Sequence, residues 1–492
     1  MRDCRFLFLA NQLEGLLFSP KRCPYGLNRS AEVGVVLGRF TKNYFHVGLL
    51  VGVAFGGLIA SSAARADTLA QALVGAYRSN STLNAERARQ RGTDEQVPQA
   101  LSGWRPTITA QGTAARQWAD TNVTDLTIAD PVNLSISLSQ PLFRGFKTLE
   151  ATKVAEANVQ AGRQQLLGVE QTTLFNAVQA YMNVVQNRQV LSLRRKFVGV
   201  LQKQLYASDA RFKAGELTRT DVAQSRASLK GAEATMAVAV ANVKAAEANY
   251  QTVIGKHPGK LAAPSLAKRP NSLDAALNIA QETNPNILLS AYVVEAAEHQ
   301  IEVIKGDLLP SLSLNGSYTY SHEPSSNVET AQNAQIQGVL TVPLYEGGRT
   351  YSAVRQAKQT ASQNRIQVIS ATRSVRENVT NAWNNLIATG QSLSGVGAQV
   401  SASRLALDGV RQEYAVGSRT TIDVLNAEQA LLNAQISSVV AQHDQVVASY
   451  QLLTAMGRMT AQRLQLGELY DPSVHYDDVR GKWIGLRAET LE

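Results

Sequence analysis

The chain has 492 residues, of which 6% are aromatic and 18% are charged, and this composition favours long packed helices over a large globular core. Its formal net charge is +9, and residues 1–66 contribute +5 (eight Lys and Arg against three Asp and Glu), so the rest carries only +4 (40 against 36). This small excess, without a basic stripe between aromatic residues, argues against a nucleic-acid-binding protein.

Residues 1–66 contain a predicted export signal. Arg39 and Lys42 precede the apolar run Val47–Ala60, and Ala64-Arg65-Ala66 is a small-residue cleavage motif. A transmembrane helix is the alternative, but a run of about 14 residues is shorter than the ~20 that a bilayer span needs. We therefore expect cleavage after Ala66, and we interpret the residues before Arg39 as an over-long start.

The sequence contains no recognisable catalytic or metal-binding motif. Cys4 and Cys23 both precede the cleavage motif, so the exported chain would hold no disulfide and no thiol nucleophile. No Ser/His/Asp signature or ATP-binding loop stands out, and four histidines lack metal-ligand spacing: His257, His299, His322 and His443. We predict a protein that is not an enzyme and that uses no metal or cofactor.

The chain after residue 66 is a tandem repeat. Three pairs of segments are similar at an offset of about 200 residues: Asp67–Leu83 with Asn271–Ile287, Trp104–Gly112 with Leu308–Gly316, and Ser139–Thr148 with Thr341–Thr350. The predicted parts are a first repeat over 67–254, a linker rich in Pro, Gly and Lys over 255–272, a second repeat over 273–458, and a tail over 459–492. The tail has no counterpart in the repeat, and we assign it no function.

Each repeat opens with a predicted helix of about 30 residues, which two strands follow. Apolar and polar residues alternate over about 105–118 and 131–142, and again over about 310–321 and 333–344. This period of two predicts strands with one apolar and one polar face. We expect the second strand of each repeat to close at a proline and to turn into helix at glycine: Pro141 and Gly145 in the first repeat, and Pro343, Gly347 and Gly348 in the second. A phosphate loop at Gly347-Gly348 would need a different spacing and a Lys.

The longest predicted elements are helices over 147–212 and 349–413, where no proline interrupts the helical spacing of apolar residues. At 1.5 Å per residue, 66 residues make a rod of roughly 100 Å. Returning helices are predicted over 218–254 and 420–456. Such rods with seams of small residues favour packing side by side as coiled coils.

A short tip separates each long helix from its returning helix. The first tip contains Gly215, Glu216, Leu217 and Thr218, and the second contains Gly417, Ser418, Arg419 and Thr420. The turn alone explains the glycines, because Gly ends a helix with a positive φ and Thr begins the next helix. Turn chemistry does not require Leu217 or Arg419, so we interpret these two as docking residues.

Four strands cannot close a membrane barrel, since known barrels begin at eight strands. Two chains would supply eight strands, whose side chains fill the interior, whereas three chains would supply twelve and leave a pore. The strand number therefore favours a trimer.

The stretch "EYAVGSRTTIDVLNAEQALLNAQ", the turn "VPLYEGG" and the tandem duplication together resemble the TolC family of outer-membrane efflux proteins, over about Asp67 to Arg458. The resemblance implies a mainly α fold with a transmembrane β part, in which a homotrimer forms a 12-stranded β-barrel in the outer membrane and a periplasmic α-barrel. It implies the exit duct of a tripartite efflux or type I secretion system for drugs, detergents or proteins. The expected partners are outer-membrane lipid, a periplasmic adaptor (membrane fusion protein) and an inner-membrane RND or ABC transporter.

The resemblance further implies a closed periplasmic end near the tips, for which we expect four gate residues: Tyr206, Asp209, Asp408 and Arg411. Asp408 pairs with Tyr206 in the repeat, where an acidic residue was expected, so the bonding pattern of the gate stays open. Solvated surface charges are the alternative interpretation of these positions. For the whole chain the alternative is a trimeric periplasmic coiled coil or adhesion protein without a channel, against which the strands argue.

Overall fold

The computed structural model describes residues 67–487, apart from 121, 123–125, 326 and 468. The predicted signal peptide and both cysteines lie outside the described residues. The described residues belong to one compact unit, which contains all the elements below.

The helical start of each repeat is broken where one helix of about 30 residues was predicted. The first repeat has α1 (Leu69–Ser79), α2 (Ser81–Asp94) and α3 (Gln96–Leu101), and the second has α6 (Leu273–Thr283) and α7 (Pro285–Lys305). Asn80 and Asn284 cause the breaks, because each has an extended backbone and caps the following helix through its side-chain oxygen. Their amide groups donate to the carbonyls of Val253 and Ala455, at distances of 3.1 and 2.9 Å.

Between these helices and the long helices lie the strands. They are β1 (Thr107–Ala114), β2 (Gln117–Ala119), β3 (Thr127–Ala129), β4 (Val132–Arg144), β5 (Ser311–Ser325) and β6 (Val328–Thr341). In the described residues β1, β4, β5 and β6 form one antiparallel sheet in that order, and β2 pairs with β3. The β2–β3 pair was not predicted, and it continues the first hairpin beyond β1 and β4.

Pro141 does not close its strand as predicted. β4 continues to Arg144 through a register shift between Pro141 and Phe143. A bulge tolerates the missing N–H of proline, and it brings Phe143 opposite Leu312. Pro343 lies two residues beyond the end of β6, in agreement with its predicted role.

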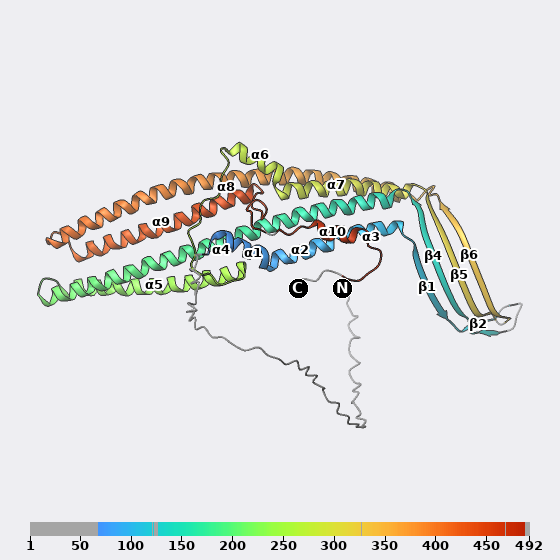
Figure 1. The fold of residues 1–492 in the computed structure, drawn as a ribbon, viewed down its shortest axis with the longest axis horizontal. Helices are drawn as coiled ribbons and strands as arrows, with labels where there is room; N and C mark the ends of the chain where they lie inside the picture. Colours follow the sequence, from blue (N-terminus) through green and yellow to red (C-terminus); the bar gives the residue numbers. More distant parts are fainter. Residues whose placement is uncertain (1–66, 121, 123–125, 326, 468, 488–492) are drawn as a thin grey trace, which may run out of the picture. The chain divides into compact units, whose positions relative to one another are not determined.

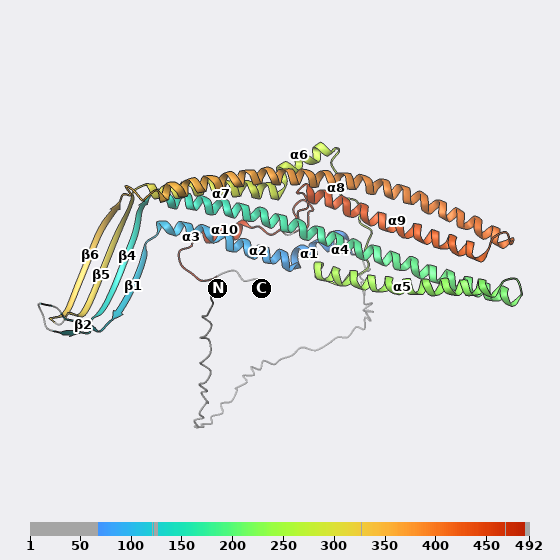
Figure 2. The ribbon, with the colours of Figure 1, turned by 180° about the vertical axis from the view of Figure 1, so that it is seen from behind.

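The long helices are α4 (Lys147–Lys213) and α8 (Arg349–Ala415), which return as α5 (Arg219–Ile254) and α9 (Thr421–Ala455). Figures 1 and 2 show these helices side by side, with the sheet leaving from the end where α4 and α8 begin. α4 packs against α5, α7 and α9, and α8 packs against α7 and α9. Within the part of the chain that the structure describes, no helix is both long and apolar enough to span a bilayer.

The main core lies where the helices of the first repeat meet the tail. Tyr181 and Leu174 of α4 and Tyr250 of α5 are fully buried there, together with Met459. The tail continues along α2 and α3 and forms α10 (Ser473–Arg480). The described part of the tail therefore packs against the helices of the first repeat.

Candidate functional site

The two hairpin tips have the same backbone geometry. Gly215 and Gly417 have φ values of 82° and 81°, in the left-handed region that glycine enters without strain. The N–H of Glu216 donates to the carbonyl of Arg211, and the N–H of Ser418 donates to the carbonyl of Glu413, both at 2.9 Å. The glycines are thus explained by the turn.

A threonine and an aspartate begin each returning helix. At the second tip the backbone N–H and the hydroxyl of Thr420 donate to the Oδ2 atom of Asp423, at 3.0 and 2.7 Å. Thr218 and Asp221 make the same pair of bonds at the first tip. The bonds from the hydroxyl and the backbone N–H of Thr420 hold the pKa of Asp423 below its ordinary value. These threonines are therefore helix caps.

The structure separates the two predicted docking residues. Arg419 has a partner within its own tip, since its Nε atom donates to the Oε2 atom of Glu413 at 2.6 Å. The docking role of Arg419 stays a prediction. Leu217 is half-buried, and the remaining residues of both tips are exposed.

A contact that the sequence argument missed joins the two tips. The guanidinium of Arg211, at the end of α4, lies 4.9 Å from the ring centroid of Tyr414, at the end of α8. The hydroxyl of Tyr414 lies 3.3 Å from that of Thr421. One sequence signal of this contact was that the aromatic position Phe212 of the first repeat is Tyr414 in the second. The position of Arg211 beside that ring follows only from the packing of the helices.

Two of the four predicted gate residues line one cavity. Asp408 and Arg411 lie with Glu428 in a cavity of about 380 Å³ between α4, α8 and α9. The guanidinium of Arg411 bonds to the carboxylate of Glu428, which is buried. Tyr206 and Asp209 are not among the lining residues, and the side chain of Tyr206 is 80% exposed. The structure therefore places Asp408 and Arg411 in one cavity, whereas Tyr206 and Asp209 lie outside it.

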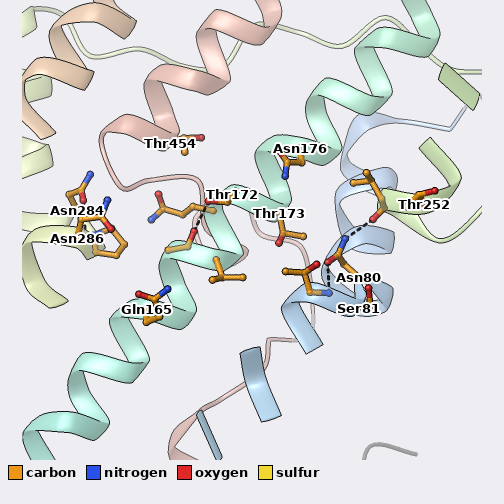
Figure 3. Close-up of a pocket in the computed structure, with 16 residues that line it drawn as sticks. Asn80, Ser81, Gln165, Thr172, Thr173, Asn176, Thr252, Asn284, Asn286 and Thr454 are labelled. Carbon is orange, nitrogen blue, oxygen red and sulfur yellow. Dashed lines mark hydrogen bonds between the residues drawn. The ribbon is translucent and has the colours of Figure 1, made fainter. Parts of the chain in front are cut away.

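A larger cavity, of about 520 Å³, lies where the returning helices end (Figure 3). Its lining holds no charged residue and is rich in amide and hydroxyl side chains, among them Asn176 and Gln165 of α4. Equivalent residues of the two repeats line this cavity on opposite sides of α4. They are Asn80 and Asn284, and Thr252 and Thr454. Sequence reasoning missed this site, although the two asparagines were visible in the repeat alignment.

The strand-to-helix turns differ between the repeats. At Gly145 the φ is 59°, and an added Cβ would lie 2.4 Å from the carbonyl oxygen of Gly306. At Gly347 and Gly348 the φ is also positive, but nothing lies within 4 Å of an added Cβ. The first turn therefore needs glycine for a close approach as well as for its backbone angle.

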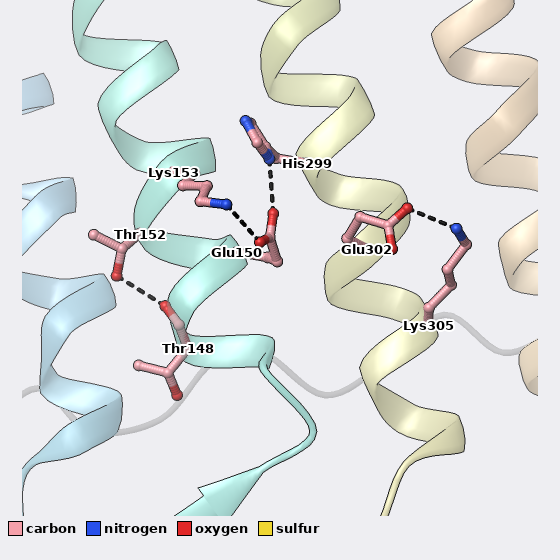
Figure 4. Close-up of polar contacts among 7 residues, drawn as sticks. All are labelled: Thr148, Glu150, Thr152, Lys153, His299, Glu302 and Lys305. Atoms are coloured by element: carbon pink, nitrogen blue, oxygen red, sulfur yellow. Dashed lines mark hydrogen bonds and ion pairs between the residues drawn. The ribbon is translucent and has the colours of Figure 1, made fainter.

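Polar contacts connect the start of α4, just after the first strand-to-helix turn, to α7 of the second repeat (Figure 4). Glu150 of α4 accepts from Lys153 at 2.8 Å and lies 2.7 Å from the Nδ1 atom of His299 on α7. Burial raises the pKa of Glu150, but the bonds with Lys153 and His299 outweigh it, so the pKa lies below its ordinary value. The carboxylate therefore stays charged between α4 and α7.

The sheet has two faces of different chemistry. Directly paired residues share a face, and side chains alternate along each strand. One face carries Ile108, Leu134, Ile136, Leu138, Leu314, Tyr318, Ile336 and Leu340. The other carries Thr109, Gln111, Ser135, Ser137, Ser139, Asn315, Ser317, Gln335 and Gln337. Apolar side chains remain exposed on the first face, where Ile336 is 82% exposed.

Hydrogen bonds run across the polar face. The hydroxyls of Thr109 and Ser137 lie 2.6 Å apart, and Ser139 donates to Asn315 at 2.8 Å. The charged residues Arg144 and Glu329 of this face lie at the ends of their strands. A sheet with an exposed apolar face, a polar face rich in serine, threonine, asparagine and glutamine, and long helices at one end is typical of a protein that crosses a membrane around a water-filled lumen.

The family model described as "Outer membrane efflux protein" matches residues 73–256 and 276–458. The chain belongs to the outer membrane efflux protein family. The two matched segments correspond to the two repeats, so each repeat of this chain matches the family model by itself.

The chain is 42% identical to the outer membrane efflux protein BepC of Brucella suis, over 88% of this chain and 95% of the relative. It is 27% identical to the outer membrane protein TolC of Escherichia coli, over 85% of this chain and 87% of the relative. Its fold matches the crystal structure of the Campylobacter jejuni CmeC outer membrane channel with a TM-score of 0.71, at 16% identity, over 84% of this chain and 89% of that chain.

These similarities confirm the predicted family, the TolC-like duplicated fold and the location in the outer membrane. Members of the outer membrane efflux protein family are channel proteins, so the chain is not an enzyme. The tips and the gate residues stay predictions.

Proposed function

We propose that three copies of this chain form a passive exit channel, which serves a tripartite efflux or type I secretion system. The observation that carries the proposal is the two-faced sheet. Its apolar face suits lipid, and its face of serine, threonine, asparagine and glutamine suits a water-filled lumen. Strands β1 and β6 are the outer strands of this sheet, so they are free to pair with neighbouring copies.

The strand lengths support a membrane crossing. β6 has 14 residues, which rise about 46 Å and, with a tilt of about 45°, still span about 33 Å. This is close to the ~30 Å hydrocarbon core of a bilayer. The helices α4 and α8 each have 67 residues and extend roughly 100 Å from the base of the sheet toward the tips.

The tips are the proposed contact with a periplasmic adaptor, and an inner-membrane RND or ABC transporter would supply the energy. Leu217 is the stronger docking candidate, because Arg419 already has Glu413 as a partner. Arg419 remains accessible at the surface of the tip, so it can exchange this partner for a carboxylate of an adaptor.

Asp408 and Arg411 are the proposed gate residues. Both line the cavity between α4, α8 and α9, so separation of the two hairpins would change their surroundings. Arg411 is held by Glu428 of its own hairpin, whereas Asp408 is the acidic residue of α8 in this cavity that we expect to respond to a neighbouring helix.

The test is ion conductance of the purified trimer in planar bilayers, with Asp408→Ala and the matched control Asp477→Ala, an exposed carboxylate on α10. We expect small cation-preferring openings that enlarge or lose selectivity in Asp408→Ala alone. A channel that Asp408→Ala leaves unchanged would remove Asp408 from the gate. No conductance from any inserted trimer would favour the non-channel alternative.

A further inference from the structure

The last described residues of the tail form a small closed loop with an apolar tip. The Nζ atom of Lys482 donates to the carbonyl of Arg487 at 3.0 Å, and Gly485 has a φ of 136° between them. Trp483 is 67% exposed, Ile484 is 92% exposed, and Leu486 is fully exposed. The loop thus presents three apolar side chains to the surroundings, with a cation at each end.

Contacts with the start of the sheet hold this loop in place. Arg105 lies two residues before β1, and its Nη1 atom donates to the carbonyl of Lys482 at 2.9 Å. The guanidinium of the same residue lies 4.7 Å from the ring centroid of Trp483. The loop is therefore fixed at the level where the strands begin.

The rest of the tail is fastened to the helices just before the loop. Arg480 bonds to the Oε1 atom of Glu156 at 2.9 Å, and the ring of Tyr476 packs against the buried cluster of Val97 and Val159. His475 lies 3.3 Å from the buried carboxylate of Asp94. These contacts make the position of the loop a property of the fold.

Other exposed apolar side chains lie beside this loop's level, at the end of the sheet next to the helices. In an antiparallel sheet the starts of β1 and β5 and the ends of β4 and β6 lie at one edge. Trp104, Phe146, Leu309 and Tyr345 flank the strands at this edge, and all four are exposed. Aromatic side chains collect at such a level in membrane proteins, where the rings meet the headgroups.

We propose that the loop of residues 482–487 is a membrane-interface anchor on the periplasmic side. Trp483, Ile484 and Leu486 enter the boundary between headgroups and acyl chains of the phospholipid leaflet, while Lys482 and Arg487 reach the lipid phosphates. The inference rests on the proposed function, because it needs the strands to cross that membrane.

The composition of the loop favours phospholipid over a protein partner. The segment "GKWIGLR" carries two cations and no acidic residue, which suits a surface of phosphates. Its apolar side chains are next to the edge of the sheet that would enter the bilayer, so the loop continues an apolar zone that the strands already form.

The test places a fluorophore on the loop of the full-length trimer. In a background without Cys4 and Cys23, Ile484→Cys is labelled with bimane and reconstituted into vesicles of phosphatidylethanolamine and phosphatidylglycerol (3:1). Quenching by a lipid with a shallow nitroxide is compared with quenching by aqueous iodide. Val474→Cys on α10 is the matched exposed control, and Ile336→Cys on the apolar face of β6 reports strand insertion.

We expect the nitroxide lipid to quench the label at position 484 at least about threefold more than the label at position 474, and iodide to show the opposite order. Quenching of the loop label by iodide alone would place the loop in water, and quenching by neither agent would place it against another copy. Both results overturn the anchor while the label at position 336 remains lipid-exposed. Loss of lipid quenching at position 336 would instead contradict the proposed membrane crossing, and the anchor with it.

Discussion

Glu428 shows how a single charge depends on its partner. Its carboxylate is buried on α9, and the half-exposed guanidinium of Arg411 on α8 compensates it. An ion pair with one solvated member is weak in itself, but a buried carboxylate that loses its partner is costly. The pair therefore acts mainly by keeping the cavity wall intact.

We expect Arg411→Ala to destabilise the α8–α9 hairpin by about 1–2 kcal/mol, because Glu428 would lose its cation. The measurement is the midpoint of thermal unfolding of the trimer in detergent. The control is Arg404→Ala, which removes an equal charge from the wall of the same cavity. Equal losses in the two variants would contradict a specific role for the pair.

The pKa of Glu170 is shifted in the opposite direction from that of Asp423. Burial raises its pKa, and neither the bond from the N–H of Ala461 at 2.7 Å nor the nearby charge of Arg87 fully offsets this effect. A carboxyl group with a raised folded pKa supports the fold at low pH and loses that contribution as the pH rises through this pKa.

Glu170→Gln should therefore raise the unfolding midpoint by about 1–2 °C more at pH 8 than at low pH, because the variant removes a negative charge that burial disfavours. Near pH 4 the difference should shrink, since the wild-type group is then largely protonated. Thermal unfolding at both pH values measures it. A variant that is less stable than the wild type at pH 8 would show that the charge itself is needed.

The linker between the repeats is held as a structural element. Arg188 donates to the carbonyls of Pro258 and Gly259 and pairs with Glu247 at 2.6 Å. The hydroxyl of Tyr181 lies 2.8 Å from the carbonyl of Asp67 and 2.6 Å from that of Ala262. Burial raises the pKa of Tyr181 to about 12, so this hydroxyl remains a donor at neutral pH.

Tyr181→Phe should loosen the linker, because the half-buried carbonyls of Asp67 and Ala262 would each lose the bond from this hydroxyl. A loss of about 1–1.5 kcal/mol would raise the open population, and with it the rate of tryptic cleavage, about tenfold. The cleavage sites are Lys256, Lys260 and Lys268. Tyr206→Phe on the exposed side of α4 serves as the control, and an equal rate in both variants would refute the role of the hydroxyl.

The assembled protein depends on the chemistry of the two sheet faces. Ile336 and Gln335 are neighbours on β6, but they lie on opposite faces and pair with Gly316 and Ser317 of β5. A charge on a lipid-facing position costs about 2–4 kcal/mol near the middle of the bilayer, whereas a position on the lumen side accepts it. A charged side chain should therefore impair assembly at Ile336 and be tolerated at the adjacent Gln335.

Ile336→Lys should lower the yield of heat-sensitive trimers in the outer membrane at least about tenfold, because three copies each place a charge in lipid. Gln335→Lys should assemble normally and reduce the preference for cations. Membrane fractionation and conductance measure the two effects. Normal assembly of Ile336→Lys with loss of Gln335→Lys would reverse the assignment of the faces.

The similar segments at a fixed offset, the spacing of apolar residues and the positions of proline and glycine were enough to predict the repeat, the long helices and the strands. A 67-residue helix without proline, or a strand with serine at every second position, is encoded in local spacing. The breaks at Asn80 and Asn284 were missed although each asparagine caps the next helix by local bonds and Pro285 follows Asn284. What the sequence could not show is the bond from each amide group to the end of α5 or α9. Pro141 was misplaced because a bulge restored the register, which depends on the partner strand.

The candidate site was less predictable than the fold. Gly215, Gly417, Thr218 and Thr420 were found because turns and caps use local bonds. The pairing of Arg411 with Glu428 and the approach of Arg211 to Tyr414 join residues of different helices or hairpins, so the packing angle of those helices decides them. The same holds for the tail, to which the sequence alone assigned no function: only the return of residues 482–487 to Arg105 beside β1 sets Trp483 at the base of the sheet. Spacing along one chain therefore encodes helices, strands and turns, whereas contacts between distant segments exist only once burial has brought those segments together.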